Sequence, residues 1–420
     1  MLIPLLVLGW LLLAAAKPFP HWPTFFRVVA QLLGNWRLRS IGPISRIRQL
    51  AGLIGWHVGL GPLWTVLWWL DELLYPAYRR APIVAPIFVV SQPRSGTTLL
   101  HRALAQHDTL VALRTYEWQF PFITVQRAFA WLVRLSGGGV SRIDHFRGDR
   151  TGTAARMHRQ RMGDYEEDGI FFEHVTLVHL FSVLRYPWPA LFDVVDRVDR
   201  LSPRARARML DVHAAAIRKV LWQRGGGTVL LKENESWLRQ EDWLRRYPDA
   251  RYVTVLRPVE AWMPSLLNLV RHSTRAKTGL DPWLIDGWCE ALVDVKVRDA
   301  GRMPHFFDTV LPAHGSLQLR IRYDELIQGL APTLERVAME LGIGVPGAFR
   351  ESLTALAMAQ ADRPPDGRHA GLTPALDELW RLRGPEFARF EAFREATPPF
   401  AAAVPATHSG SRSSAAQTST

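Results

Sequence analysis

The stretch that decides the fold reads IFVVSQPRSGTTLLHRAL and covers residues 87–104. Its first four residues are apolar and predict a short buried strand, and the spacing of apolar residues after the glycine predicts a helix to about residue 107. A glycine-bearing turn that opens a helix presents backbone N–H groups and the positive end of the helix dipole, which suits a phosphate group. The candidate ligands in this turn are Arg94, Ser95, Gly96, Thr97 and Thr98.

This turn differs from a nucleoside-triphosphate-binding loop at two positions. Ser91 stands where the pattern G-x-x-x-x-G-K-[ST] has its first glycine, and Thr97 stands where it has its lysine. The later apolar segment 251–256 also lacks the acidic residue that would hold magnesium at its end. The sequence therefore favours a phosphorylated ligand other than a magnesium-bound triphosphate, with a degenerate P-loop kinase as an alternative.

Strands alternate with helices on both sides of this stretch. Apolar segments predict strands at 228–231, 251–256 and 317–322. Helical periodicity predicts helices at 120–135, 204–224, 237–247, 259–271, 282–301 and 332–341. This alternation predicts an α/β fold with a central parallel sheet flanked by helices.

Composition limits the class of protein further. Of the 420 residues, 48% are hydrophobic and 21% are charged, which excludes a wholly disordered or fibrous chain. The single cysteine, Cys289, excludes an internal disulfide framework, and no Cys/His spacing is typical of a zinc site. His174 and His179 are interpreted as ordinary histidines. The sequence thus predicts a globular protein without a metal.

Five segments together resemble the sulfotransferases that use 3′-phosphoadenosine 5′-phosphosulfate (PAPS), over about residues 85–345. PRSGTTLL at 93–100 is similar to the family's 5′-phosphosulfate loop, in its bacterial and tyrosylprotein-sulfotransferase forms. Arg257 with Ser265, eight residues later, resembles the 3′-phosphate element, although Pro258 replaces an aspartate. The remaining similarities are LLK at 230–232, IRYDEL at 321–326 and the acidic DYEED at 164–168.

The resemblance implies a P-loop-like sulfotransferase fold and a set of roles. Arg94 and Lys232 would hold the transferring sulfuryl group, and Glu117 would be the general base, with His107 and His101 as second choices. The implied PAPS ligands are Arg94, Ser95, Gly96, Thr97, Thr98, Arg257, Ser265 and Tyr323. The implied reaction moves a sulfuryl group from PAPS to a hydroxyl or amine and releases adenosine 3′,5′-bisphosphate.

Several residues have a structural interpretation at this stage. The acidic run Glu166, Glu167 and Asp168 is expected on a solvated face or at a helix start. The tryptophans expected in the core rather than against a substrate are Trp118, Trp237 and Trp262.

The amino-terminal part has its own character. The formal net charge is +12, and half of it lies in the first 50 residues, which contain no acid. Apolar runs at 1–16 and 51–70 flank this basic stretch, so acidic lipid is a better partner than nucleic acid. One anchor, two spans, an interfacial location and a buried core helix remain open for these runs. In the interfacial case Trp56, Trp64, Trp68 and Trp69 would lie at headgroup level.

The predicted organisation has three parts. Residues 1–80 form an apolar helical N-terminal extension that associates with a membrane, residues 81–396 form the sulfotransferase domain, and residues 397–420 form a disordered tail. The catalytic domain is expected in the cytoplasm, or in the Golgi lumen of a eukaryote. The acceptor is expected to be a small molecule, lipid-like or carbohydrate. An inactive, membrane-attached nucleotide or anion binder of the same fold remains the main alternative.

Overall fold

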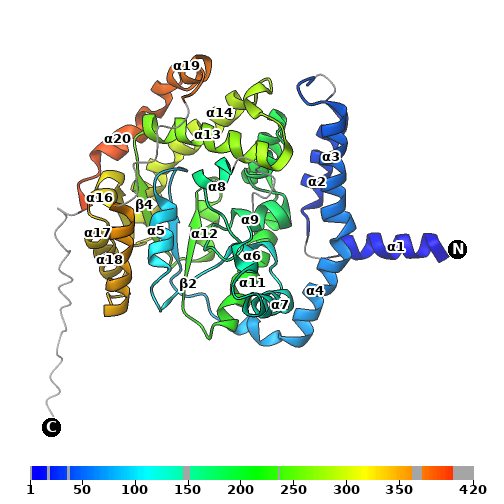
Figure 1. The fold of residues 1–420 in the computed structure, drawn as a ribbon, viewed down its shortest axis with the longest axis horizontal. Helices are drawn as coiled ribbons and strands as arrows, with labels where there is room; N and C mark the ends of the chain where they lie inside the picture. Colours follow the sequence, from blue (N-terminus) through cyan, green and yellow to red (C-terminus); the bar gives the residue numbers. More distant parts are fainter. Residues whose placement is uncertain are drawn as a thin grey trace, which may run out of the picture.

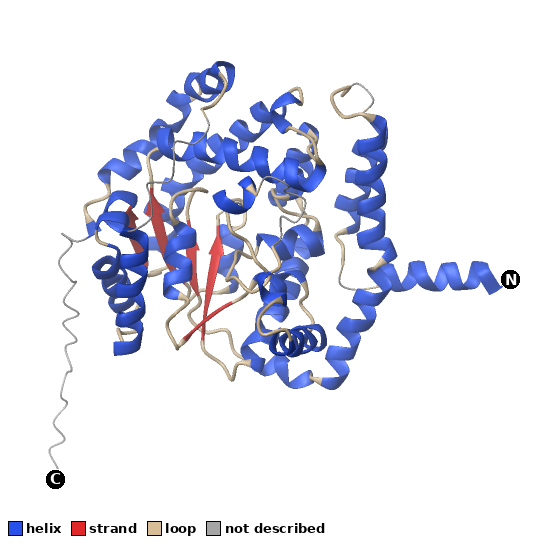
Figure 2. Ribbon diagram, in the orientation of Figure 1, coloured by secondary structure: helices blue, strands red, loops and turns tan. Residues whose placement is uncertain are grey.

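A computed structural model describes residues 2–16, 19–35, 38–144, 152–234, 237–361 and 371–400. Its centre is a five-stranded sheet with the order β2-β3-β1-β4-β5, in which every neighbouring pair is parallel (Figure 2). The strands are β1 (Ile87–Val90), β2 (Leu110–Ala112), β3 (Thr228–Glu233), β4 (Arg251–Leu256) and β5 (Gln318–Arg322). The α/β prediction is therefore confirmed. The sequence missed β2, which has only three residues and no alternation to reveal it.

Helices cover both faces of the sheet. Since side chains of each strand point alternately to opposite faces, each strand contributes to two separate cores. Ile87 and Val89 of β1 pack in one core, whereas Phe88 and Val90 pack in the other. The helices of the first core are α5 (Thr97–Leu104), α16 (Tyr323–Gln328), α17 (Leu330–Glu340) and α18 (Gly347–Ala361). The second core includes α11 (Pro203–Gln223), α12 (Gln240–Arg246), α13 (Val259–Thr278) and α14 (Trp288–His305). The layers are visible in Figure 1.

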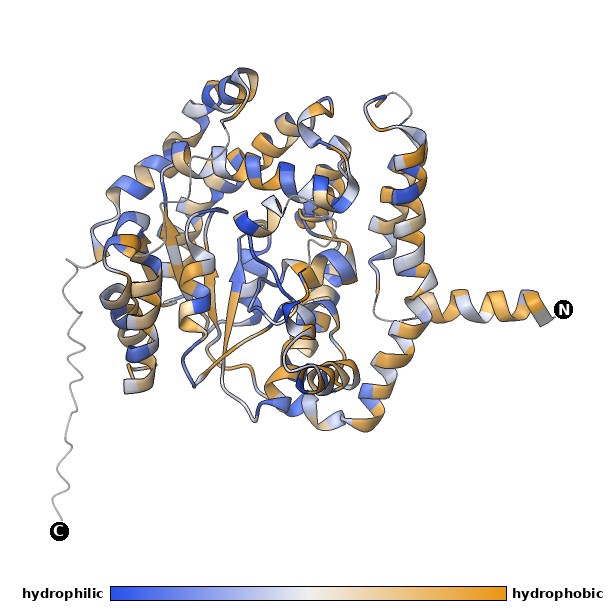
Figure 3. Ribbon diagram, viewed as in Figure 1, coloured by the Kyte–Doolittle hydropathy of each residue, from blue (hydrophilic) through white to orange (hydrophobic). Residues whose placement is uncertain are grey.

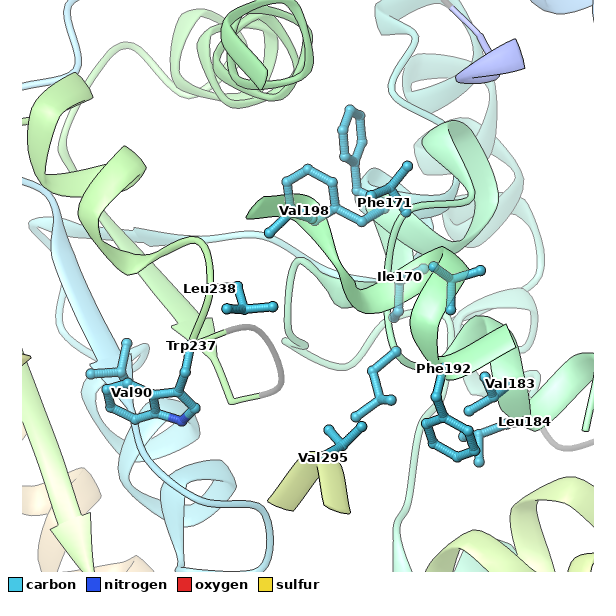
Figure 4. Close-up of a cluster of buried hydrophobic side chains, with 14 of the residues drawn as sticks. Val90, Ile170, Phe171, Val183, Leu184, Phe192, Val198, Trp237, Leu238 and Val295 are labelled. Carbon is cyan, nitrogen blue, oxygen red and sulfur yellow. The ribbon is translucent and has the colours of Figure 1, made fainter. Parts of the chain in front are cut away.

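The second core is the larger of the two and contains most of the aromatic residues. Figure 4 shows part of it, where Val90, at the end of β1, lies beside Trp237. Trp118, Trp237 and Trp262 are all buried, as predicted. Shorter helices complete this side: α6 (Thr115–Gln119), α7 (Ile123–Leu135), α8 (Thr153–Met157), α9 (Gly169–Phe171), α10 (Ser182–Arg185), α15 (Leu311–Ala313), α19 (Pro374–Leu382) and α20 (Ala388–Ala396).

The amino-terminal helices lie along one side of this body. They are α1 (Leu2–Ala15), α2 (Trp22–Gly34), α3 (Pro43–Ile54) and α4 (Gly61–Leu74). A π-helical turn at Gly55–Gly59 joins α3 to α4, and together they form the one described helix that is long and apolar enough to cross a membrane. Helix α1 projects away from the body, and its apolar side chains are exposed along its length (Figures 1 and 3).

The apolar run at 51–70 is neither fully buried nor fully free. Trp64 and Trp68 are buried and contact Phe19 edge to face, so these two rings are not available at a membrane surface. Trp69, one position further, is exposed, as is Val66. The run therefore has one face in the core and one face outside it. The interfacial placement of all four tryptophans is wrong, because two of them are in the core. A helix buried on all sides is also excluded, because the other face is exposed.

The amino-terminal helices share one hydrophobic core with the α/β body. Phe25 and Leu53 belong to the same hydrophobic cluster as Phe171. At the other end of the chain, Thr397 and Phe400 are buried, so the packed part extends beyond the predicted start of the tail. The rest of that predicted tail, 401–420, lies outside the described residues.

Candidate active site

The turn after β1 has a backbone that only certain residues can adopt. Arg94 and Gly96 both have positive φ, 66° and 91°, and α5 begins directly afterwards at Thr97. A Cβ atom on Gly96 would lie 3.1 Å from the ring of Tyr323. Glycine is therefore required by both the backbone angle and the close approach of the aromatic ring.

Strand register brings the other predicted residues to this turn. Lys232 on β3 lies opposite Val89 of β1, one residue before β1 ends. Arg257 directly follows β4, and Tyr323 directly follows β5. Because parallel strands end at the same edge of a sheet, residues far apart in the sequence meet beside the turn, as ligand sites in open α/β sheets do.

These residues line one cavity of about 940 Å³. The predicted residues on its wall are Arg94, Gly96, Thr97, Thr98, Lys232, Arg257 and Tyr323. Seven cationic side chains face three carboxylates around this wall, so the cavity favours an anionic ligand. The structure thus brings together most of the predicted site.

Two arginines link the turn at 94–98 to β4 and α13. Arg94 donates a hydrogen bond from Nε to Ser265 Oγ at 2.9 Å, and Arg257 donates from Nη1 to the Arg94 carbonyl at 2.7 Å. The Arg257 guanidinium lies 4.4 Å from the ring centre of Tyr323, a cation–π contact. Ser265 is fully buried and holds Arg94 rather than lining the cavity itself.

Two buried donors of this site have no hydrogen-bond partner within the described chain. They are Ser95 Oγ and Arg257 Nε. Because a buried donor without a partner costs about 1–3 kcal/mol, such groups at a functional site indicate a ligand that satisfies them. Arg257 lines the cavity and can offer its Nε–H to an anion there, whereas Ser95 is fully buried and is not on the cavity wall. The turn and Arg257 together fit an anion with two separate groups.

Lys232 is the charged centre of the cavity. Its Nζ lies 2.7 Å from Glu166 Oε1, 3.5 Å from Glu167 Oε2 and 3.1 Å from Thr98 Oγ1. Burial lowers the pKa of Lys232, but the two carboxylates outweigh this effect and raise it above its usual value. Burial likewise raises the pKa of Glu166, and Lys232 outweighs it, so that the pKa of Glu166 lies below its usual value. Both groups are charged at neutral pH.

The acidic run was predicted on a solvated face or at a helix start, and the first of these is wrong. Glu166, Glu167 and Asp168 are all buried, because they follow the path of β3 and pair with its residues. Glu167 lies on the cavity wall and accepts a hydrogen bond from Asn234 Nδ2 at 3.2 Å. Asp168 does precede a helix, the short α9.

His158 is a cavity residue that the sequence analysis did not identify. Its Nε2 lies 3.7 Å from Glu166 Oε2, and its side chain lines the cavity. Burial lowers the pKa of His158 to about 4, although Glu166 opposes the shift, so the imidazole is neutral at neutral pH. No spacing in the sequence indicates this residue, since α8 and the loop around it carry no recognisable motif. Glu167, by contrast, stands in the acidic segment that the resemblance singled out.

Glu117, the predicted general base, is not on the cavity wall. Arg224 donates to both of its carboxylate oxygens at 2.7 Å, and the backbone N–H of Arg114 donates to Oε2 at 2.7 Å. The side chain therefore closes the start of α6 and pairs with the end of α11. The prediction placed Glu117 by its distance along the sequence from Arg94, which does not determine where a short helix points.

The two alternative bases are also displaced from the cavity. His101 is buried, and burial lowers its pKa to about 3. His107 packs edge to face on Phe349, with 4.8 Å between ring centres, and its Nδ1 contacts Thr109 Oγ1 at 2.9 Å. Neither ring lines the cavity.

The described residues contain no group of three or more His, Cys, Asp or Glu side chains able to hold a metal ion. Cys289 is buried, and burial raises the pKa of its thiol to about 12.

Comparison with known proteins agrees with this geometry. Residues 86–347, more than half of the chain, match the model of the sulfotransferase family. The protein therefore belongs to the sulfotransferase family. A search of curated proteins found no match.

Two solved structures share the fold. Sulfotransferase STF9 from Mycobacterium avium superimposes with a TM-score of 0.60 at 18% identity, covering 89% of this chain and 90% of its own. Sulfotransferase STF1 from Mycobacterium tuberculosis H37Rv gives a TM-score of 0.56 at 18% identity, covering 87% and 92%. Both are similar in fold over most of the length of this chain.

Proposed function

We propose that this protein transfers a sulfuryl group from PAPS to a hydroxyl group of an amphipathic acceptor and releases adenosine 3′,5′-bisphosphate. The observation that carries the proposal is that Lys232 and two anion-binding elements meet at the ends of the neighbouring strands β3, β1 and β4. One element is the turn at 94–98, and the other is Arg257 with Tyr323. A donor with a phosphosulfate at one end and a phosphate at the other needs two such elements.

In this proposal the loop and Arg257 bind the donor at its two ends. The backbone N–H groups at the start of α5 and the hydroxyls of Thr97 and Thr98 on the cavity wall hold the phosphosulfate, because the helix dipole favours an anion there. Arg257 holds the 3′-phosphate through its unpaired Nε–H, and the Tyr323 ring next to it provides a surface for the adenine. Ser265 accepts from Arg94 and keeps its own hydroxyl proton for donation.

Pro258 is compatible with this assignment. It stands immediately before α13, with φ −56° and ψ 144°, and Glu391 of α20 accepts the first backbone N–H of the helix, from Val259, at 2.7 Å. The turn after Arg257 is therefore well formed without the aspartate of the family element. Arg257 keeps its place at the end of β4.

PAPS supplies an activated sulfuryl group whose transfer leaves a phosphate anion. Arg94 and Lys232 stabilise the negative charge on the sulfuryl and leaving-group oxygens, which is the main task of the protein in such a transfer. Glu167 replaces Glu117 as the proposed general base, because its carboxylate lies on the cavity wall 3.5 Å from Lys232 Nζ. A base in that position receives the proton of an acceptor hydroxyl next to the sulfuryl group.

We also propose that the amino-terminal helices attach the protein to an anionic membrane surface, with the catalytic body in the compartment that holds PAPS. Support comes from the exposed apolar side chains of α1 and of the outer face of α3 and α4. Arg39 is exposed on the connection between α2 and α3 and would meet acidic lipid. An amphipathic acceptor fits this location.

Calorimetric titration of the purified full-length protein with adenosine 3′,5′-bisphosphate tests the donor site, with ATP–Mg²⁺ and 5′-AMP as comparisons. Selective binding of the bisphosphate is expected, with a loss of at least tenfold in Arg257→Ala. Arg350→Ala, an exposed arginine of α18 outside the cavity, is the matched control and should bind normally. A folded sample that does not bind the bisphosphate would overturn the proposal, and preference for ATP–Mg²⁺ would favour the kinase alternative.

A further inference from the structure

A second cavity lies between the amino-terminal helices and the catalytic body. It holds about 480 Å³, and one of its walls comes from α3 and the π-helical turn, with Arg48 and Gln49. The opposite wall comes from the body, with Glu173, Arg185 and Lys277. Nothing in the proposed donor site uses these residues.

The second cavity meets the catalytic cavity at an ion pair. Glu173 and Lys277 line both cavities, with Lys277 Nζ 3.2 Å from Glu173 Oε1. Part of the wall of the catalytic cavity is apolar. Its apolar residues on α9, α10, α13 and the loop before α10 are Ile170, Phe181, Leu184, Leu266, Leu269 and Val270. The catalytic cavity therefore combines Lys232 with an apolar wall and adjoins the second cavity at the shared ion pair.

The second cavity carries an excess of positive charge. Arg185 Nε and Lys277 Nζ both pair with Glu173, at 3.0 Å and 3.2 Å, so one carboxylate serves two cations. Arg48 adds a third cationic side chain from α3. Three cations against one carboxylate favour an anion in the chamber.

Gln49 provides an independent observation. Its side chain is more than nine-tenths buried, and its Oε1 accepts a hydrogen bond from Trp188 Nε1 at 2.7 Å, which fixes which end of the amide is the donor. The Nε2 group has no hydrogen-bond partner within the described chain, and the residue lines the second cavity. A buried amide donor without a partner is satisfied by a ligand oxygen, in agreement with the positive charge around it.

We infer that the second cavity binds an anionic end of the acceptor, whose hydroxyl end lies at Lys232 and whose apolar middle lies between α10 and α13. The inference rests on the proposed function and narrows the acceptor to an anionic amphiphile with a distant hydroxyl group. The helix that builds the outer wall also exposes Ile44 and Ile47, so the chamber adjoins the surface assigned to the membrane. Such an acceptor passes from the lipid surface to the cavity without crossing open water.

Calorimetry with 12-hydroxydodecanoate tests the inference, and 1,12-dodecanediol, which has the same length and no charge, is the matched comparison. We expect the carboxylate to bind at least tenfold more tightly than the diol. Arg48→Glu should abolish this preference without changing the affinity for the diol. Arg27→Glu makes the same charge change at an exposed site of α2 outside the cavity and should keep the preference.

Equal binding of the two probes would overturn the inference, as would an equal effect of Arg48→Glu and Arg27→Glu, since that result reports general surface charge. Adenosine 3′,5′-bisphosphate is titrated into the same samples. Bisphosphate binding without preference for the carboxylate overturns only the acceptor assignment. Preference for the carboxylate without bisphosphate binding overturns the proposed function, and the acceptor role of the chamber falls with it.

Discussion

Two carboxylate–cation pairs of this protein have the same separation but differ in burial and in their position relative to the sheet. Glu166 lies 2.7 Å from Lys232, and Glu117 lies 2.7 Å from Arg224. The first pair is buried at the end of β3 beside the phosphate-binding turn, whereas Arg224 keeps 29% of its side chain exposed at the end of α11. The first pair belongs to the catalytic cavity and the second holds two helices together.

This difference teaches that position relative to the sheet, rather than distance along the sequence, determines which acid can act. The ends of parallel strands meet at one edge, so a lysine on β3 reaches a turn that begins 138 residues earlier, at Arg94. Glu117 lies in α6, the helix that follows β2 at the side of the sheet, and it is not on the cavity wall. Four variants or conditions test the contrast.

The largest effect is expected for Lys232→Met. Loss of the cation next to the transferring group should lower kcat/KM by about 10³-fold, the range found when a stabiliser of developing charge is removed. The variant also removes one of two cationic partners of Glu166, because Arg102 Nη2 stays 3.0 Å from Glu166 Oε2, so the loss of unfolding free energy should be smaller than the about 3–5 kcal/mol of a fully unpaired buried charge. The double variant Lys232→Met, Glu166→Gln should recover stability and not turnover, measured by thermal unfolding and sulfate transfer. Recovery of turnover would remove Lys232 from the reaction.

Glu167→Gln should lower kcat by about 10²-fold or more, the contribution of a general base, while the affinity for adenosine 3′,5′-bisphosphate stays the same. The amide keeps the shape of the side chain and cannot take up a proton. Turnover is measured with saturating donor, and binding by calorimetry. An unchanged kcat would show that the acceptor proton leaves by another route.

Glu117→Gln makes the same carboxylate-to-amide change in the Glu117–Arg224 pair. It should keep normal turnover and lose about 1–2 kcal/mol of unfolding free energy, because the ion pair with Arg224 is partly hydrated. Chemical denaturation and turnover of the same sample give the two numbers. A loss of turnover with unchanged stability would return Glu117 to the catalytic role.

The smallest effect is expected in the pH dependence of stability, to which His158, beside Glu166, contributes. Its pKa is lowered to about 4 in the fold, whereas an unfolded histidine titrates near 6.5. Between these values the unfolded chain binds the extra proton, so stability is complete above pH 6.5 and falls as the pH drops toward 4, by up to about 1.4 kcal/mol per pH unit. His158→Gln should reduce this slope, measured by denaturation across the range, whereas His314→Gln, at an exposed site, should not. Equal slopes in both variants would contradict the assignment.

The sequence by itself determined the sheet and the donor end of the site. Apolar runs marked four of the five strands, and the turn with Gly96 marked the anion site, because local backbone requirements are written in adjacent residues. Arg257 and Tyr323 were identified through the family resemblance, and in the structure each directly follows a strand. Parallel pairing then makes their meeting point a consequence of topology.

Only the tertiary structure decided which further polar residues line the cavities. His158, Glu167 and the second cavity depend on how loops and amino-terminal helices pack against the body, and no periodicity records such contacts. The burial of the acidic segment has the same origin, since Lys232 compensates charges that composition alone assigns to solvent. Short-range patterns encode strands and turns, whereas long-range packing decides which polar side chains face a cavity.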